Sequence, residues 1–123
     1  MVIDTSAILA VFFKEPHCEW VMTQMDLYVR ELRMSTVNLT ETLVHLQDRQ
    51  PQLFSILEEK LIYSGIRFVA PSVEQAKIAT QARMKFPLNL GDCFAYALAI
   101  EEGCPIVTLD KDFRALPHDI LLP

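Results

Sequence analysis

Acidic side chains interrupt or adjoin apolar runs at three places along this chain: Val2-Ile3-Asp4, Leu90-Gly91-Asp92-Cys93-Phe94-Ala95 and Ile106-Val107-Thr108-Leu109-Asp110. Carboxylates flanked in this way are partly buried, and several of them brought together repel one another unless one stays protonated or a cation lies between them. A hard divalent ion relieves this repulsion, and an oxygen-rich site with open water positions suits Mg²⁺ or Mn²⁺. Such an ion can activate water and stabilise the leaving oxygen during attack on a phosphate ester.

Hydroxyl side chains accompany these acids. Thr5 and Ser6 follow Asp4, and Thr108 lies two residues before Asp110. They can orient carboxylates or a metal-bound water from outside the ligand set. For Ser6, capping of the helix that follows Asp4 is an equally good explanation, and the two roles are compatible.

The elements that must position these side chains alternate along the chain. Apolar runs predict strands at residues 1–4, 33–35, 66–70, 105–109 and 120–122. Between them, helical periodicity predicts helices at about residues 8–13, 16–29, 35–49, 51–64, 72–85 and 93–102, and a turn or short helix at 110–116. Strands that alternate with helices indicate an α/β fold with a mainly parallel sheet.

Ligands of open α/β sheets bind at the carboxyl ends of the strands, near the point where the strand order reverses. Asp4 and Asp110 each end a predicted strand, so their carboxylates meet if the two strands are neighbours. Glu41 lies in the helix after the second predicted strand. Asp92 lies in the first turn of the helix that precedes the fourth predicted strand. A first-turn Asp is also favoured by the helix dipole, so capping remains an alternative for Asp92.

Composition limits the class of protein. The 123 residues fit one domain, and 51% hydrophobic with 22% charged residues is typical of a globular chain. No apolar run is long enough for a membrane span, and no basic segment precedes the first strand, so we expect a cytoplasmic protein. Three widely spaced cysteines predict reduced, mostly buried thiols rather than structural zinc. His17 and His118 stand beside prolines and are expected at the surface.

Four segments in order resemble the motifs of PIN-domain nucleases, particularly the VapC-type toxins of toxin–antitoxin pairs. Residues 1–8 resemble the first motif, residues 38–43 the segment with the helical Glu, residues 88–99 the third motif and residues 103–113 the last. The resemblance places Asp4, Glu41 and Asp92 at the metal-binding positions. Relatives carry the fourth acid either at the position of Asp110 or at that of Asp112; we expect Asp110 to be the closer ligand and Asp112 a helper, with a helix cap as the alternative for Asp112.

The resemblance implies a three-layer α/β/α domain with a five-stranded, mainly parallel sheet in the order 3-2-1-4-5. It further implies Mg²⁺- or Mn²⁺-dependent hydrolysis of RNA, a homodimer, and inhibition by a small antitoxin protein. A net charge of −5 argues against nucleic-acid binding unless the acids are concentrated at a metal site. The basic side chains that could contact RNA are Lys85, Lys111 and Arg114, with Arg49 at the end of the Glu41 helix.

Rival classes fit less well. A response-regulator receiver needs a pair of acids after the first strand and an Asp after the third, where this chain has Ala70-Pro71. A haloacid-dehalogenase-type phosphatase needs a second Asp where Ser6 stands. The remaining alternative is a PIN-like domain that acts as a binding or assembly module without turnover.

Overall fold

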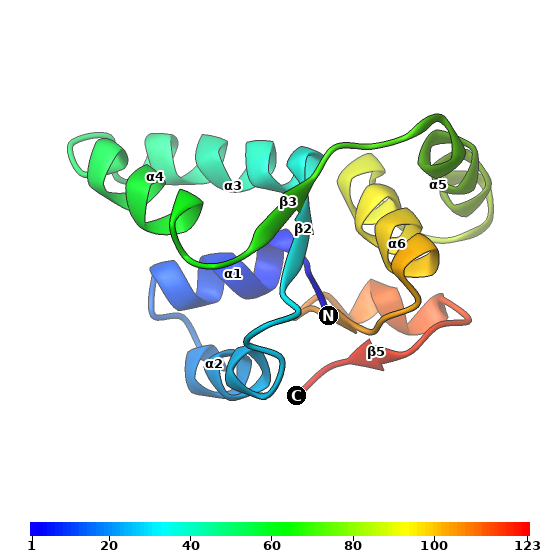
Figure 1. Cartoon of the computed structure of the whole chain (residues 1–123), viewed down its shortest axis with the longest axis horizontal. Helices are drawn as coiled ribbons and strands as arrows, with labels where there is room; N and C mark the ends of the chain where they lie inside the picture. The colour runs from blue at the N-terminus through cyan, green and yellow to red at the C-terminus, as the bar shows by residue number, and fades with distance from the viewer.

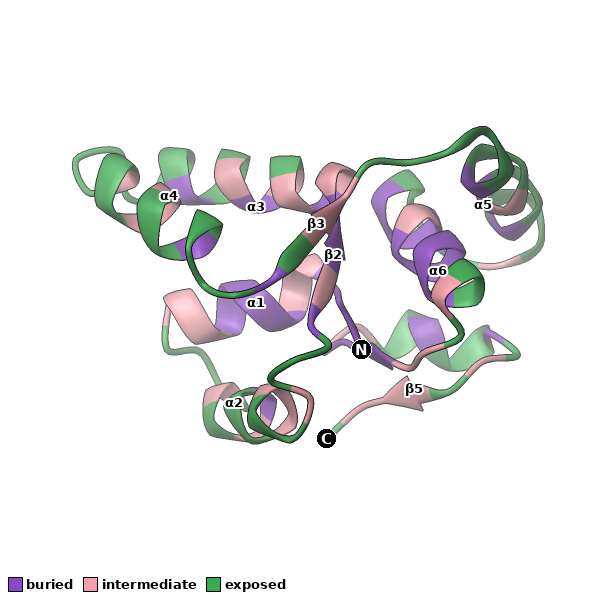
Figure 2. Ribbon diagram, viewed as in Figure 1, coloured by how far each residue is buried: buried purple, intermediate pink, exposed green.

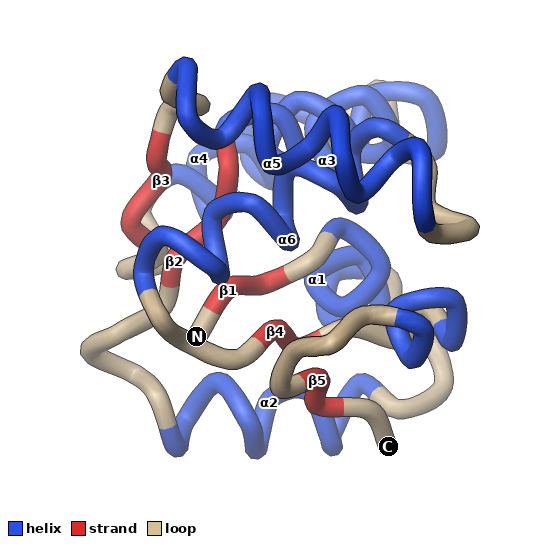
Figure 3. Tube along the Cα trace, turned by 90° about the vertical axis from the view of Figure 1, so that its right-hand side faces the viewer, coloured by secondary structure: helices blue, strands red, loops and turns tan.

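The computed structural model describes all 123 residues and contains one five-stranded sheet with the strand order β3-β2-β1-β4-β5, visible from one edge to the other in Figure 3. All neighbouring strands are parallel. The strands are β1 (Val2–Ile3), β2 (Arg33–Ser35), β3 (Arg67–Val69), β4 (Ile106–Val107) and β5 (Ile120–Leu121). The predicted α/β class, the parallel sheet and the strand order are thus confirmed.

Six α-helices and a short 3₁₀ helix surround the sheet: α1 (Thr5–Phe12), α2 (Cys18–Leu27), α3 (Thr36–Arg49), α4 (Phe54–Ile62), α5 (Val73–Lys85), α6 (Leu90–Glu102) and η1 (Lys111–Ala115). Helices α5 and α6 lie on one side of the strands and α1 to α4 on the other (Figure 1). None of these helices is both long and apolar enough to cross a membrane.

The two layers of helices enclose two separate cores, because successive residues of a strand point to opposite faces. Val2 and Ile106 pack with α5 and α6, whereas Ile3 and Val107 pack with the helices of the opposite layer. In Figure 2, buried residues make up most of α6 and the end of β2, whereas α4 is largely exposed and β3 and β5 have no buried residue. The sheet therefore has helices on both faces, as the predicted three-layer arrangement requires.

Several local predictions need correction. Helix α4 begins at Phe54 rather than Pro51, and α6 begins at Leu90 because Asn89 caps it. His118 is only partly exposed: its Nε2 lies 2.7 Å from the Cys104 carbonyl oxygen, which takes no part in the sheet hydrogen bonds. All three cysteines are free as predicted, but only Cys93 is buried.

Candidate active site

An open hollow of about 200 Å³ lies at the carboxyl ends of β1 and β4. Residues from α1, α3, α6 and the segment after β4 line it, namely Asp4, Thr5, Ser6, Leu9, Glu41, His45, Asn89, Asp92 and Asp110. Four of the five acids expected at the site are therefore brought together. They converge here because β1 and β4 are paired, Ile3 with Val107, and because α3 and α6 begin at this edge of the sheet.

Asp4 is the most buried acid of the hollow, with 2% of its surface exposed. Its Oδ2 accepts hydrogen bonds from Ser6 Oγ at 2.7 Å, from Thr108 Oγ1 at 2.8 Å and from the Ser6 amide at 3.3 Å. Its Oδ1 is buried and has no partner. Burial raises the pKa of the Asp4 carboxyl, and the hydrogen bonds from Ser6 and Thr108 oppose this shift. One oxygen is thus held in place while the other lacks the partner that a buried polar atom normally has.

The hydroxyls of Ser6 and Thr108 join the ends of the two central strands. They lie 3.1 Å apart, Ser6 Oγ accepts the Leu109 amide at 3.0 Å, and Thr108 Oγ1 accepts the Asp110 amide at 3.0 Å. Asp4 itself, rather than Ser6, caps α1. Ser6 and Thr108 therefore fix the Asp4 carboxylate relative to the backbone that carries Asp110.

Glu41 is positioned by a buried amide that the sequence analysis did not single out. Glu41 Oε1 accepts hydrogen bonds from Thr5 Oγ1 at 2.9 Å and from Asn38 Nδ2 at 3.0 Å. Asn38 is fully buried, and its Nδ2 also lies within hydrogen-bond distance of the Gly91 carbonyl, at 3.1 Å. Asn38 thereby links α3 to the first turn of α6, and a Cβ at Gly91 would collide with both carboxylate oxygens of Glu41.

Gly91→Ala should therefore damage the site more than the fold. The added methyl group meets the end of a flexible side chain, so the Glu41 carboxylate moves while α6 remains intact. We expect Mn²⁺ affinity to fall about 10- to 100-fold, as when metal ligands lose their orientation, and the free energy of unfolding to change by less than about 1 kcal/mol, since alanine favours helix. Calorimetric titration with Mn²⁺ and urea unfolding measure the two effects. Leu90→Ala, at an exposed neighbouring position, is the control; unchanged Mn²⁺ affinity in Gly91→Ala would contradict this account of Glu41.

Asp92 combines the two roles that the sequence left open. It is the third residue of α6, where its Oδ2 accepts the Asn89 amide at 3.1 Å and its own amide donates to Asn89 Oδ1 at 2.9 Å. Burial and the negative charge of Asp4 raise the pKa of Asp92 to about 7, with smaller contributions from Asp110 and Glu41 and an opposing one from the Asn89 amide. Asp92 is thus both a capping residue and a member of the acidic group.

Asp110 and Asp112 differ in position. Asp110 lines the hollow. Asp110 also caps η1, because its Oδ1 accepts a hydrogen bond from the Asp112 amide at 2.9 Å. Asp112 is exposed and is not among the lining residues. His45, one turn after Glu41 on α3, does line the hollow, as does Asn89.

The basic candidates are exposed. Lys85, Lys111 and Arg114 form no ion pair. Arg49 is engaged elsewhere, since it pairs with Glu15 at 3.5 Å and its guanidinium carbon lies 3.5 Å from the centre of the Phe13 ring. Of these four candidates, only Lys85, Lys111 and Arg114 therefore retain uncompensated charge.

The donor set of the hollow fits a hydrated divalent cation. No three Asp, Glu, His or Cys side chains are close enough to enclose an ion by themselves. Mg²⁺, however, usually keeps several waters and binds through one or two carboxylates. The unpartnered Oδ1 of Asp4 and the mutual repulsion that raises the pKa of Asp92 are both relieved by such a cation.

The fold and the site together define a doubly wound α/β protein with an open acidic centre at the carboxyl edge of its sheet. The sequence model of the PIN domain matches residues 1–119. The chain belongs to the PIN-domain family.

Among curated proteins, the chain is 31% identical to ribonuclease VapC42 of Mycobacterium tuberculosis over 122 residues, which cover 92% of each chain. It is 35% identical to a ribonuclease VapC of Mycolicibacterium smegmatis over 123 residues, 93% of this chain and 94% of that protein. Solved structures share the fold. VapC20 of M. tuberculosis, described as a toxin that cleaves the sarcin–ricin loop, superposes with a TM-score of 0.82 at 16% identity over 99% of this chain and 98% of that one. The DNA-bound VapBC complex of Salmonella typhimurium superposes with a TM-score of 0.80 at 20% identity, over 98% of this chain and 95% of that one.

Proposed function

We propose that this protein is a divalent-metal-dependent ribonuclease and the toxin of a toxin–antitoxin pair. The observation that carries the proposal is the convergence of Asp4, Glu41, Asp92 and Asp110 on one hollow in which a buried oxygen of Asp4 has no partner. Curated relatives named as VapC ribonucleases support RNA as the substrate, and structural neighbours solved as toxin–antitoxin complexes support a small antitoxin partner.

Asp4, Glu41, Asp92 and Asp110 would hold Mg²⁺ or Mn²⁺, with Asp112 at most a helper from outside the hollow. When bound, such an ion supplies Lewis acidity at the phosphate and lowers the pKa of a water molecule. The protein's own part is orientation: Ser6 and Thr108 hold Asp4, while Thr5 and Asn38 hold Glu41. Lys111 and Arg114, on η1 next to Asp110, would contact RNA phosphates.

Purified, antitoxin-free protein should cut RNA in Mg²⁺ or Mn²⁺ and stop when a chelator is added. The reason is that the four carboxylates repel one another without a cation, and no lysine or arginine lines the hollow. Gel analysis of mixed transfer, ribosomal and messenger RNA measures the effect, and restoration of cleavage by excess Mn²⁺ is the control. Undiminished cleavage in chelator would refute metal dependence, and absence of cleavage in every metal would refute the nuclease.

The proposed assembly is a homodimer in the cytoplasm that a cognate antitoxin inhibits. Light scattering of the protein alone tests the homodimer. Light scattering and RNA cleavage with a co-expressed antitoxin test binding and inhibition.

A further inference from the structure

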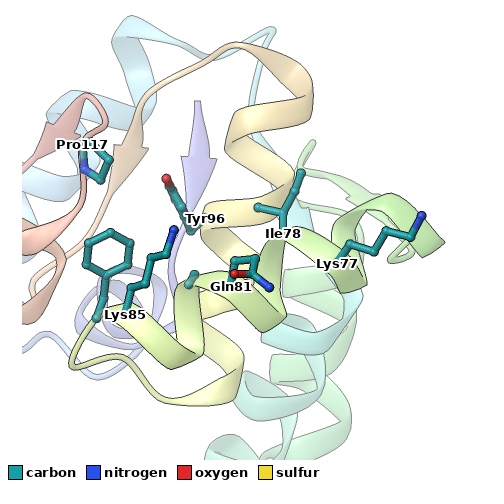
Figure 4. A pocket seen from close by; sticks show the side chains of 8 residues that line it. Lys77, Ile78, Gln81, Lys85, Tyr96 and Pro117 are labelled. Carbon is teal, nitrogen blue, oxygen red and sulfur yellow. The ribbon is translucent and has the colours of Figure 1, made fainter.

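A second hollow, of about 390 Å³, lies between α5, α6 and the segment after η1 (Figure 4). Its volume is within the range of small-molecule sites. Apolar groups line most of it, among them Ile78, Phe86 and Pro117, and four polar side chains reach it, Lys77, Gln81, Lys85 and Tyr96. None of the four acids of the candidate active site belongs to it.

Tyr96 is the buried polar side chain of this hollow. It is 8% exposed, yet its hydroxyl makes no hydrogen bond within the protein. The rings of Phe86 and His118 meet it edge-on, with centroids 6.4 Å and 5.8 Å away, and Nε2 of His118 is already engaged with the Cys104 carbonyl. Burial raises the pKa of Tyr96, so the hydroxyl remains a donor. The hydroxyl oxygen is not itself buried, so it is open to the hollow and free to bond an occupant.

Lys85 supplies charge at the same place. It has no ion pair, whereas Lys77 is already paired with Glu74 at 3.4 Å. In Figure 4 the Lys85 ammonium and the Tyr96 hydroxyl point toward the same end of the hollow, and Lys77 extends away from them. An apolar occupant would bond to neither polar group. A planar ring with a hydrogen-bonding edge, joined to an anionic group, matches the aromatic wall, the hydroxyl and the ammonium together.

The hollow is within reach of the acidic site. Tyr96 lies four residues after Asp92 on α6, which is one helical turn or about 6 Å along the same face. Phe86 lies three residues before Asn89, which lines the acidic hollow. A single strand of RNA could therefore occupy both hollows.

We propose that the hollow formed by Lys85, Phe86 and Tyr96 binds one nucleobase of the substrate, with the Lys85 ammonium at its phosphate. This inference rests on the proposed function and adds a site of base selection to it. Base stacking on aromatic walls combined with a cationic side chain is how single-stranded nucleic acid is commonly held.

Binding can be tested without cleavage. In chelator, the four ribonucleoside 5′-monophosphates should shift the nuclear magnetic resonances of Phe86 and Tyr96, and one base should do so at a concentration at least about fivefold lower than the others. Ribose 5-phosphate, which lacks the base, should not shift them. Lys85→Gln should weaken nucleotide binding about tenfold, whereas Lys60→Gln, on α4 in the opposite layer, should not. Absence of shifts with every nucleotide, or shifts that follow protein concentration because a second copy fills the hollow, would overturn the proposal.

Tyr96→Phe keeps the ring and removes only the hydroxyl. In the metal-loaded protein it should change the ratio of kcat/KM between RNAs that differ in one base near the cut by about fivefold or more. If the wild type cuts RNA and Tyr96→Phe keeps the same base preference, the hydroxyl does not select bases and the proposal fails while the nuclease stands. If no RNA is cut but nucleotides bind this hollow, the proposed nuclease fails and the binding site stands.

Discussion

Asp4→Asn should reduce RNA cleavage by more than about a hundredfold and leave the chain folded. The loss should exceed the roughly 10- to 100-fold that follows removal of residues that only orient metal ligands. Asp4 is the one acid whose carboxylate is held by three hydrogen bonds on one oxygen while the other oxygen is buried without a partner. The amide oxygen of asparagine can take over those three bonds, so the end of β1 and the start of α1 keep their structure. Circular dichroism and cleavage rates in Mn²⁺ measure the two parts.

Asp112→Asn is the matched control for this loss. Asp112 is exposed and contributes only its backbone amide, which donates to Asp110 Oδ1. Cleavage should stay within about threefold of wild type in Asp112→Asn and fall by more than about a hundredfold in Asp110→Asn, which loses a proposed ligand. Equal losses in the two variants would show that both acids serve the site, and full activity in Asp4→Asn would remove the basis of the proposed nuclease.

The fold class could be predicted from the sequence because the order of the elements and the apolar residues within the strands point to the same architecture. Strands alternate with helices, and Val2 and Ile3 are both apolar because each faces one of two covered layers. The acids Asp4 and Asp110 could be paired because each follows such a strand, and β1 does lie beside β4. The exact strand order, in contrast, came from the resemblance to a family rather than from periodicity.

Two residues that position the acids, Asn38 and Gly91, were not identified from the sequence. The hydroxyls of Thr5, Ser6 and Thr108 were expected to orient carboxylates because they stand next to the acids in the chain. Asn38 and Gly91 are 53 residues apart, and their contact exists only because the first turns of α3 and α6 meet. Polar residues in helices usually lie in solvent, so nothing local marks Asn38 as fully buried. The spacing of Asp110 and Asp112 was equally uninformative: only the structure shows that Asp110 lines the hollow and caps η1, while Asp112 is exposed in the first turn of η1.

Asp92→Asn should make the metal-free protein more stable at pH 8, even though it removes an acid from the site. The folded protein holds Asp92 with a pKa of about 7, against an ordinary value of 3.8. Between about pH 4 and pH 7 the folded state therefore binds a proton that the unfolded state has released. The free energy of unfolding then falls as the pH rises through this window, and the stability lost is fully present again below pH 4. Asparagine carries no charge at any pH, and its side-chain oxygen can still accept the Asn89 amide.

The difference between Asp92→Asn and wild type should therefore grow from near zero at pH 4 to a few kcal/mol at pH 8, since each pKa unit corresponds to about 1.4 kcal/mol. Urea unfolding in chelator across this range measures it, and Asp112→Asn, whose carboxyl is exposed, should follow the wild type throughout. A wild type and an Asp92→Asn variant with parallel stability curves would contradict the raised pKa that burial and the charge of Asp4 give Asp92.

Metal should narrow the difference in stability between Asp92→Asn and the wild type. A cation that binds the ionised carboxylates of the folded state alone adds about 2.7 kcal/mol at a concentration 100 times its Kd. The wild type should gain this increment in Mn²⁺ at pH 8, and Asp92→Asn should gain much less because a ligand is gone. If the protein is instead an inactive PIN-like domain without a metal site, its free energy of unfolding should still fall with rising pH but should not increase in Mn²⁺. The two measurements together thus separate the cost of ionising Asp92 in the metal-free hollow, which burial and the neighbouring carboxylates set, from the binding of the ion that the proposed nuclease requires.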